Sequence, residues 1–247
     1  MEINKITADT DFTEGVVINV DKPYGWTSAD VVRKLKFLLS KISGHKKLKV
    51  GHAGTLDPLA TGVLLVCVGK ATKQADALQA ERKEYVAEVM LGATTPSYDL
   101  EHPVDATYPW EHITPKMVEQ ALRDLTGERL QTPPIYSAKK FEGRHAYDFA
   151  REGEELKMES RQVLINIYNI EILELDLPRL VIRVECSKGT YIRSLACEIG
   201  EQLQSGAHLT ALRRTRSGEF TTENAFVLDD LLKKLHEMKQ NLVDHVI

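Results

Sequence analysis

The chain has 247 residues, of which 43% are hydrophobic and 28% charged, and its formal net charge at pH 7 is −4. This length allows a sizeable core in one large domain or two small ones, and the composition is that of an ordinary globular protein. A membrane-spanning protein is excluded, because no apolar run approaches the roughly 20 residues that cross a bilayer. The polar, acidic first residues lack the pattern of a secretory or transit signal, so we expect a cytoplasmic location.

The cysteines and short motifs give no indication of a metal or cofactor site. Cys67, Cys186 and Cys197 lack CxxC spacing, and two of them lie in apolar runs, which is typical of structural thiols in a reducing compartment. The sequence has no P-loop, no Rossmann fingerprint and no cluster of metal ligands. We therefore expect no disulfide, no bound metal and no cofactor.

The negative net charge conceals separate clusters of basic residues. The first lies between Asp30 and Asp57, a stretch without any acidic residue, and two more follow later in the chain. The clusters are Arg33, Lys34, Lys36, Lys41, Lys46, Lys47 and Lys49, then Lys139, Lys140 and Arg144, then Arg213, Arg214 and Arg216. Each cluster alone fits a solvated face, but together they favour a surface that binds the phosphates of RNA.

In chain order, the first segment is a loose tail over residues 1–14, followed by a strand, a turn and a helix. The β-branched run Val16–Val20 predicts the strand, and the DKPYG sequence after it has turn chemistry. Thr27 and Asp30 have the spacing of a capping box, and apolar residues at helical spacing continue to Ile42. The polar face of this helix carries part of the first basic cluster.

Residues 48–73 combine a rigid loop with a buried strand and hold the best candidate for a reactive group. Glycines and a proline restrict the backbone of the loop, and the apolar run Val63–Val68 follows it. One carboxylate, Asp57, lies within the loop, and His52 precedes it by five residues. A rigid loop with a single acid suits a reactive group on a supporting scaffold, although an aspartate before a proline is more often a simple turn residue.

The middle of the chain alternates between helices and strands. We expect a short helix over Ala71–Arg82, and period-two alternation predicts a strand from Lys83 to Gly92 in which Tyr85 faces the core. A start signal and apolar spacing predict a helix over Thr114–Gly127. The segment 131–160 then interleaves aromatic and basic side chains, which suits unstacked RNA bases and phosphates or, equally, a loop that packs its own aromatics.

The rest of the chain predicts two strands, a helix, a strand pair and a last helix. The strands are expected over residues 163–175 and 180–186, and the helix over residues 191–203. Tyr191 and Arg193 therefore stand near a helix N-terminus, where backbone N–H groups favour an anion. A strand pair with a Ser-Gly turn over residues 206–220 and an amphipathic helix over residues 227–246 end the chain.

The order of these elements indicates the fold class. Helices and strands intermix without the strict βαβ rhythm of a parallel sheet, so we expect an α+β fold. No internal repeat or low-complexity linker divides the sequence. We therefore expect one domain over residues 15–247, with residues 131–160 as an insertion.

Several separated blocks of this sequence resemble the TruB family of pseudouridine synthases, and they keep the family's order. The strongest is GHAGTLDPLATG at residues 51–62; DKPYGWTS precedes it, and KEY, CSKGTYIR and AHLTALRRTRSGEF follow. The segment PPIYSAKKFEGRHAYDFAREG resembles the mobile thumb of the family. The stretch ATTPSYDLEHPV at residues 93–104 departs from the family's usual continuation.

The resemblance implies a mixed, largely antiparallel central sheet with flanking helices and a catalytic cleft. Many members of the family carry a further small RNA-binding domain, for which this sequence has no room, so we expect no PUA-like domain at the C-terminus. The family resemblance implies the isomerisation of uridine to pseudouridine at position 55 in the T-loop of tRNA, after the base has been flipped out. This reaction breaks the C1′–N1 bond and forms a C1′–C5 bond without net oxidation, so it needs no cofactor. The implied partner is the T-arm of tRNA, and we expect a monomer that needs no protein partner and no membrane.

The resemblance also implies roles for residues around the Gly-rich loop. Asp57 is the implied catalytic residue, and whether it acts on the sugar or on the base stays open. His52 is a candidate for filling the space of the flipped uridine, or else a simple hydrogen-bonding residue of the loop. In the family, the turn at Lys22 and Pro23 supports the catalytic loop, whereas an ordinary surface lysine is the alternative interpretation of Lys22.

Four later residues match substrate-binding positions of the family. Tyr85 corresponds to the tyrosine that stacks on the target base, and Tyr191 to a tyrosine that contacts substrate. Arg193 corresponds to the arginine that pairs with the catalytic aspartate and would keep it charged. Leu212 corresponds to a leucine that lines the uridine pocket. For Tyr85 and Leu212, packing in the protein core is the simpler alternative.

Two other functions stay open. One is an RNA-binding helper that opens and re-forms the T-loop region of tRNA, with catalysis secondary. The other is a related synthase that acts at sites selected by a guide RNA, which the missing C-terminal RNA-binding domain and the sequence of the thumb disfavour.

Overall fold

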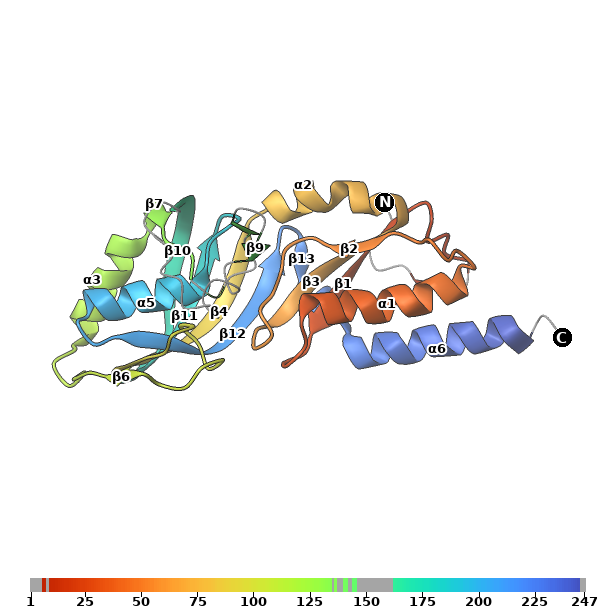
Figure 1. Cartoon of the computed structure of the whole chain (residues 1–247). Helices are drawn as coiled ribbons and strands as arrows, with labels where there is room; N and C mark the ends of the chain where they lie inside the picture. Colours follow the sequence, from red (N-terminus) through yellow and green to blue (C-terminus); the bar gives the residue numbers. More distant parts are fainter. Residues whose placement is uncertain are drawn as a thin grey trace. The chain divides into compact units, whose positions relative to one another are not determined.

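The structure is a computed structural model, and it describes residues 6, 7, 9–134, 136, 140, 141, 144, 145 and 162–244. The chain divides into two compact units. Figure 1 labels many of their helices and strands and colours the chain from its N-terminus to its C-terminus. Unit 1 comprises residues 1–83 and 213–247, and unit 2 comprises residues 84–212, so the chain leaves the first unit and later returns to it. This division does not test the prediction of a single domain over residues 15–247, which stays a prediction.

The sheet of unit 1 is built on two long antiparallel strands, β1 (Val16–Lys22) and β3 (Thr61–Val68), as the apolar runs predict. The short strand β2 (Val50–His52) also pairs antiparallel with β3. The last part of β12 (Ala207–Ser217) runs parallel to β3 and then turns back into β13 (Phe220–Thr221), which confirms the strand pair expected there. Because β1, β2 and β12 all pair with β3, this strand is the centre of the unit.

The core of unit 1 fixes the loop that precedes β3. One cluster of buried side chains joins this loop to the strands and to the turn after β3. Its members are Val17, Ala53, Val63, Leu65, Cys67, Ala71 and Phe220. Burial raises the pKa of the Cys67 thiol to about 11, as expected for a structural cysteine. The loop residue Ala53 is thus anchored in the core four positions before Asp57.

Two long helices of unit 1 pack against each other. Helix α1 (Ser28–Ile42) begins at the predicted capping box, in which the side chains of Thr27 and Asp30 each accept the other's backbone N–H. Helix α6 (Leu228–Asp244) packs against α1, and the short strand β14 (Phe226–Val227) before it pairs parallel with β1. Both helices therefore confirm the amphipathic patterns in the sequence.

The single helix expected over residues 71–82 is shorter and is divided. A 3₁₀ helix, η1 (Gly69–Gln74), leads into a two-turn helix, α2 (Ala75–Ala80). The buried ammonium of Lys83 ends this helix by donating to the carbonyl oxygens of residues 78, 79 and 81 at 3.2, 2.7 and 2.6 Å. Lys83 also begins the next strand, so the chain turns sharply where the alternation starts.

The described part of the N-terminal segment is packed rather than loose, which corrects the expectation for residues 1–14. Ile6 and Phe12 are each only 1% exposed. Gly69 has a φ of 59°, and a Cβ added to it would lie 2.1 Å from the Phe12 carbonyl oxygen. Glycine at position 69 therefore allows the N-terminal segment to lie directly on the turn after β3.

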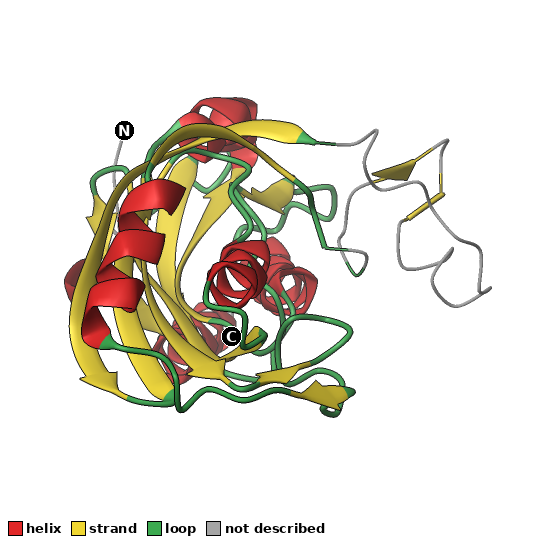
Figure 2. Ribbon diagram, turned by 90° about the vertical axis from the view of Figure 1, so that its left-hand side faces the viewer, coloured by secondary structure: helices red, strands yellow, loops and turns green. Residues whose placement is uncertain are grey.

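The sheet of unit 2 has the strand order β12-β4-β11-β10-β7, to which β12 contributes its first part. In β4 (Lys83–Leu91), buried and partly exposed residues alternate along the whole strand, as predicted. The strands β10 (Val163–Asp176) and β11 (Arg179–Cys186) form a long antiparallel pair, and β7 (Gly127–Gln131) pairs antiparallel with the start of β10. The α+β class and the largely antiparallel sheet are thus confirmed, and Figure 2 shows the strands in yellow and the helices in red.

Two helices and a small hairpin complete the described part of unit 2. Helix α3 (Pro115–Leu125) begins at Thr114, whose side chain accepts the N–H of Met117, and α5 (Ile192–Gln202) packs against it. The strands β5 (Ala93–Thr94) and β6 (Ala106–Thr107) pair antiparallel and enclose the stretch that departs from the family pattern. The start signal of α3 and the position expected for α5 are therefore confirmed.

The expected thumb over residues 131–160 falls mostly outside the described residues. Within it the structure describes residues 131–134 and 136 and a two-stranded antiparallel pair, β8 (Lys140–Phe141) and β9 (Arg144–His145). Lys139 and Tyr147, which carried part of the expected RNA contacts, lie outside them. In the described part of the chain, no helix combines the length and the apolar composition needed to cross a membrane.

Candidate active site

The loop that carries Asp57 is held by hydrogen bonds to both neighbours of this residue. The Ser28 hydroxyl accepts the Leu56 N–H at 2.9 Å and donates to the Leu56 carbonyl oxygen at 3.1 Å. On the other side, the Gly25 N–H donates to the Pro58 carbonyl oxygen at 2.9 Å. Asp57 itself is partly exposed. A partly exposed carboxylate on a backbone fixed at both adjacent residues suits chemistry that needs accurate positioning.

Lys22 is buried and binds the backbone of this loop, so the alternative that it is an ordinary surface lysine is wrong. Its side chain is 0% exposed, and its ammonium donates to the carbonyl oxygens of Pro23, Trp26 and Pro58 at 3.1, 2.6 and 3.3 Å. Burial lowers the pKa of Lys22 to about 8, although the charge of Asp57 opposes this shift. The Lys-Pro turn and the Asp57 loop are therefore one hydrogen-bonded assembly within unit 1.

His52 lies at the end of β2, directly before the Asp57 loop. Burial, and secondarily the charge of Arg214, lower the pKa of its imidazole, so it is neutral at pH 7. Its Nδ1 atom is buried and has no hydrogen bond to any residue that the structure describes. This atom therefore does not serve the expected role of a loop hydrogen-bonder, whereas the filling of a vacated base position stays a prediction.

Arg214 lies next to the Asp57 loop, whereas sequence analysis placed this residue only in a basic cluster. Its guanidinium is 1% exposed and donates to the carbonyl oxygens of Gly54, Thr55 and Val63. The preceding residue, Arg213, points elsewhere and pairs with Asp21 at 2.6 Å. The alternation of a strand predicts that two consecutive arginines face opposite sides, but it does not indicate which of them is buried.

In unit 2, the N-terminus of α5 places Tyr191 and Arg193. The Gln131 side chain accepts the Tyr191 N–H at 2.8 Å and donates to the Tyr191 carbonyl oxygen at 3.1 Å. One turn later, the Ser194 hydroxyl donates to the Thr132 carbonyl oxygen at 2.8 Å. The fully buried Gln131, which the sequence did not single out, thus ties the start of this helix to the end of β7.

Arg193 is buried, and two of its partners come from residues 93–104, the stretch that departs from the family pattern. Its guanidinium donates to the carbonyl oxygens of Ser97 at 3.2 Å and Tyr136 at 2.9 Å, and its Nε lies 3.7 Å from the Asp99 carboxylate. The side chains of Arg193 and Asp99 are 4% and 8% exposed. The Tyr136 ring also stacks on His102, with the ring centroids 4.4 Å apart. Sequence analysis missed Asp99, because the segment around it departs from the family pattern.

The remaining two candidates lie on strands of unit 2. Tyr85 is 9% exposed on the buried face of β4, and Leu212 is half-buried in β12. His52, Asp57, Lys22 and Pro23 belong to unit 1, whereas Tyr85, Tyr191, Arg193 and Leu212 belong to unit 2. The substrate contacts of the second group and the pairing of Arg193 with Asp57 stay predictions.

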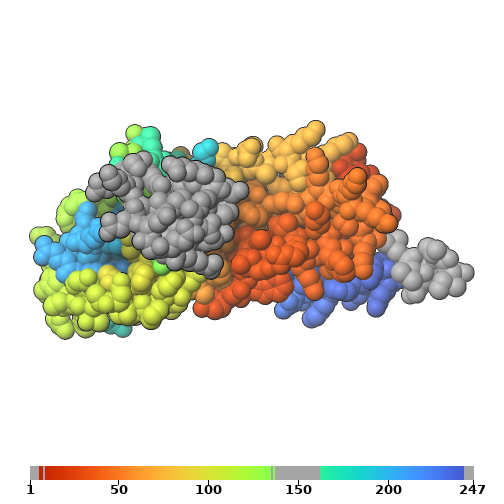
Figure 3. Space-filling model, in the orientation of Figure 1, coloured from red at the N-terminus to blue at the C-terminus, as the bar shows by residue number. Residues whose placement is uncertain are grey.

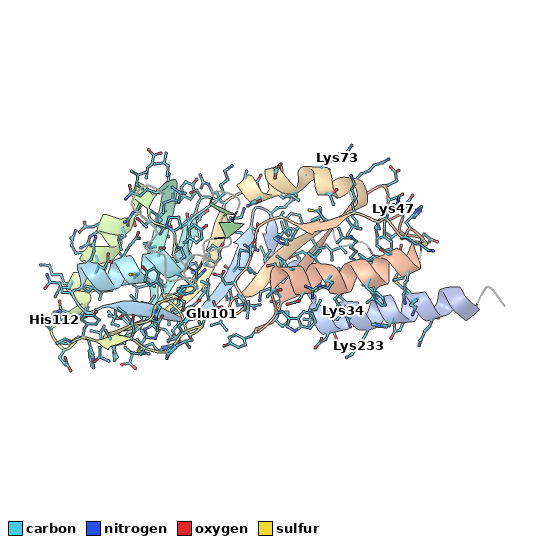
Figure 4. All side chains as sticks on the ribbon, viewed as in Figure 1. Lys34, Lys47, Lys73, Glu101, His112 and Lys233 are labelled. Atoms are coloured by element: carbon cyan, nitrogen blue, oxygen red, sulfur yellow. The ribbon has the colours of Figure 1, made fainter. Side chains whose placement is uncertain are left out.

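A basic hollow lies between the segment after α1 and the 3₁₀ helix η1. Its cavity volume is about 460 Å³. The basic residues that line it are His45, Lys46, Lys47, Lys49, Lys70 and Lys73. Figure 4 labels Lys47 and Lys73, and Figure 3 shows the surrounding surface of this part of the chain in orange. This concentration of lysines, without an acidic side chain in the lining, suits a polyanion.

Comparison with known protein families gives two matches that together cover most of the chain. Residues 40–192 match the family described as "TruB family pseudouridylate synthase (N terminal domain)". Residues 193–247 match the "tRNA pseudouridylate synthase B C-terminal domain". The first match contains Asp57, Tyr85 and Tyr191, and the second begins at Arg193.

Individual relatives agree with these matches. The tRNA pseudouridine synthase B of Bacteroides fragilis is 57% identical over 86% of this chain and 90% of its own length. The protein of the same name from Flavobacterium johnsoniae is 50% identical, over 87% of this chain and 93% of its own. A solved structure of a Cbf5-Nop10-Gar1 complex contains a chain with 34% identity and a TM-score of 0.71; this chain aligns over 96% of its length with 59% of that one. This chain belongs to the TruB family of pseudouridylate synthases.

Proposed function

We propose that this protein isomerises uridine to pseudouridine at position 55 in the T-loop of tRNA. Family membership supports the reaction, and the names of relatives at 50–57% identity support tRNA as the substrate. The T-loop position rests on the sequence resemblance. The reaction breaks the C1′–N1 bond and forms a C1′–C5 bond with no net oxidation and no second substrate.

The observation that carries this proposal is the fixed position of Asp57. The two residues beside it are hydrogen-bonded to Ser28, Gly25 and Lys22. The backbone that carries the carboxylate is therefore fixed on both sides. An ionised carboxylate held in this way acts as a nucleophile toward the uridine, or abstracts a proton from its sugar. Both routes need accurate placement more than they need flexibility.

The target base must leave the folded T-loop, at a cost of roughly a few kcal/mol. In this proposal His52, neutral at pH 7, fills the vacated position, and Tyr85 stacks on the extruded ring. Leu212 lines the pocket, and Tyr191 and Arg193 contact the bound nucleotide from the N-terminus of α5. The planar guanidinium of Arg193 is suited to stabilise an anionic centre.

The basic hollow supports RNA as the partner. It gathers lysines from two separate segments, 44–49 and 69–73, and the first of these segments ends directly before β2 and the Asp57 loop. We propose that the hollow takes phosphates of the T-arm while the target uridine lies at Asp57. The protein acts as a monomer without a protein partner, whereas the Cbf5 chain of the solved structure is in a complex with Nop10 and Gar1.

The test is nucleotide-resolution mapping of pseudouridine in an unmodified tRNA transcript after incubation with purified protein. Asp57→Asn is compared with wild type and with Asp76→Asn, which changes an exposed aspartate of α2. We expect wild type and Asp76→Asn to form one product in the T-loop. Asp57→Asn should lose on the order of 10⁴-fold or more in rate, because it lacks the reactive carboxylate.

Binding separates this proposal from the alternative of an RNA-folding helper. The affinity of Asp57→Asn for tRNA should stay within about tenfold of wild type, since the substitution preserves size and shape. Tight binding by wild type without any pseudouridine would favour the helper function. Normal turnover by Asp57→Asn would remove Asp57 from the mechanism.

A further inference from the structure

Arg214 is a buried charge that the proposed chemistry does not use. Its side chain is 1% exposed and is among the largest fully buried side chains of the protein. Removing a guanidinium from water costs roughly several kcal/mol unless hydrogen bonds compensate the loss. The groups that compensate it therefore indicate its role.

The partners of Arg214 are backbone carbonyl oxygens at both ends of the Asp57 loop. Its Nη2 and Nη1 donate to Gly54 at 3.2 Å and to Thr55 at 3.4 Å, where the loop begins. Its Nε donates to Val63 at 2.7 Å, where the loop has already joined β3. One rigid, planar group thus joins the two ends of a segment that has Asp57 between them.

The position of Arg214 is itself fixed by close contact between strands. β12 pairs in parallel with β3, with Arg214 opposite Gly62. Gly62 has a φ of 100°, and a Cβ added to it would lie 2.2 Å from the Arg214 carbonyl oxygen. Position 62 therefore requires glycine, and this close approach brings the guanidinium into reach of the loop.

The charge of Arg214 also acts on the two titratable groups that flank the loop. It adds to burial in lowering the pKa of Lys22 and of His52. The same Lys22 is attracted by Asp57. Two buried cations, Lys22 and Arg214, thus bind the backbone of the loop that carries Asp57, while the imidazole at the end of β2 stays neutral.

We propose that Arg214 is a positioning residue for Asp57, which ties the ends of the catalytic loop together and supplies positive charge beneath it. This inference rests on the proposed function, because it assigns Arg214 to the reaction of Asp57. Lysine cannot replace it, since an ammonium is a single point charge and cannot reach both ends of the loop at once. The residue acts through the loop and does not touch the uridine.

The experiment compares Arg214→Lys and Arg214→Met with Arg213→Lys and Arg213→Met. The two arginines are adjacent in β12, but Arg213 pairs with Asp21 and is 41% exposed. Arg214→Lys should lower the single-turnover rate of pseudouridine formation by about 100-fold, the effect of misplacing a reactive group by about 1 Å. Its affinity for tRNA should stay within about threefold of wild type. The single-turnover rate of Arg213→Lys, measured at saturating protein, should stay within about threefold of wild type.

Two readouts distinguish positioning from a merely structural role. Amide hydrogen exchange of residues 53–63 should be faster in Arg214→Lys than in Arg213→Lys, while exchange in α1 stays unchanged. In a ¹⁵N-labelled imidazole titration, the pKa of His52 should be higher in Arg214→Met than in wild type, because a neighbouring cation is lost. Should Arg214→Met fail to fold, the exchange and rate data on Arg214→Lys carry the test alone.

Wild-type turnover in Arg214→Lys, or a loss of rate with unchanged exchange in the loop, would overturn the inference. Failure of the proposed function is a separate outcome. Absence of pseudouridine with wild-type protein rejects that function and with it the link between Arg214 and catalysis. Faster loop exchange in Arg214→Lys would then describe a structural clamp only, which also overturns the inference.

Discussion

Each of the two units contains a buried arginine beside its own candidate site residues, and the charges of the two arginines are compensated in different ways. In unit 1, Arg214 donates to the carbonyl oxygens of Gly54, Thr55 and Val63. In unit 2, Arg193 also donates to carbonyl oxygens, but its Nε lies 3.7 Å from the carboxylate of Asp99. One arginine thus holds a backbone, whereas the other takes part in a buried ion pair.

This difference predicts how each site responds to substitution. The acceptors of Arg214 are backbone carbonyl groups, which no substitution of an acceptor side chain removes directly. The contact of Arg193 with Asp99 can be broken from either side, and loss of one partner leaves an uncompensated charge in the interior. A single side-chain change at the acceptor is therefore expected to disturb the arginine of unit 2 more than that of unit 1.

The largest expected effect comes from breaking the ion pair of unit 2. Arg193→Lys and Asp99→Asn should each lower the single-turnover rate by about 100-fold, since the guanidinium then loses its fixed position. Asp99→Asn should also destabilise the protein by about 3 kcal/mol, the cost of removing one partner of a buried pair. Single-turnover kinetics and urea unfolding measure the two effects.

A matched control lies in the same unit. Arg183 and Glu171 form a shorter pair, at 2.6 Å, but their side chains are 41% and 50% exposed. Arg183→Lys and Glu171→Gln should each change stability by less than about 1 kcal/mol and leave the rate unaltered. Equal effects at the two pairs would show that burial does not distinguish them, and the contrast between the arginines would fail.

The sequence was informative where the determinants are local. The capping box at Thr27, the alternation in β4 and the string around Asp57 each lie within a few residues, and the structure bears out the elements they predict. The sequence could not reveal that Arg214 is the buried member of its cluster, because its partners lie about 150 residues away. Asp99 was missed because the segment around it departs from the family pattern and because its partner Arg193 also lies far along the chain.

In the N-terminal segment, sequence analysis predicted less packing than the structure shows. Its composition predicts a loose tail, yet Ile6 and Phe12 are buried. The few apolar side chains of this polar stretch form no periodic pattern, and the surface that receives the segment includes Gly69, far along the chain. Tertiary packing therefore overrides composition here.

The next effect concerns Lys22, the buried lysine that binds the Asp57 loop in unit 1. Folding lowers the pKa of Lys22 from 10.5 to about 8, chiefly through burial. Below about pH 8 Lys22 is protonated in both the folded and the unfolded protein, and burial of its charge lowers the free energy of unfolding by its full amount. Between about pH 8 and 10.5 the unfolded state binds more protons, so the free energy of unfolding should rise with pH in this window.

The measurement is urea unfolding of wild type and Lys22→Met from pH 7 to pH 10.5. At about 1.4 kcal/mol per unit of pKa, the difference between 10.5 and about 8 sets an upper limit of about 3 kcal/mol on the pH-dependent gain of wild type over the variant. Lys36→Met, at an exposed position of α1, serves as control and should follow wild type. Parallel curves for wild type and Lys22→Met would contradict the assignment of Lys22 as a buried cation.

The smallest effect separates all these buried cations from the exposed lysines of the basic hollow. Buried cations bind atoms of the protein, so they release no counterions when RNA binds, whereas phosphate-binding lysines do. Lys46→Ala combined with Lys47→Ala should therefore lower the slope of log K against log salt concentration for tRNA binding by about 1.5, at about 0.7–0.9 per lysine. At moderate salt we expect about a tenfold loss of affinity and an unchanged single-turnover rate at saturating protein.

Two single variants serve as controls. Lys233 is a 76% exposed lysine of α6 outside the hollow, and Lys233→Ala should leave the slope unaltered, as should Lys22→Met. An unchanged slope in the double variant would mean that the hollow does not contact phosphates, and RNA binding would then depend on other cations of the chain.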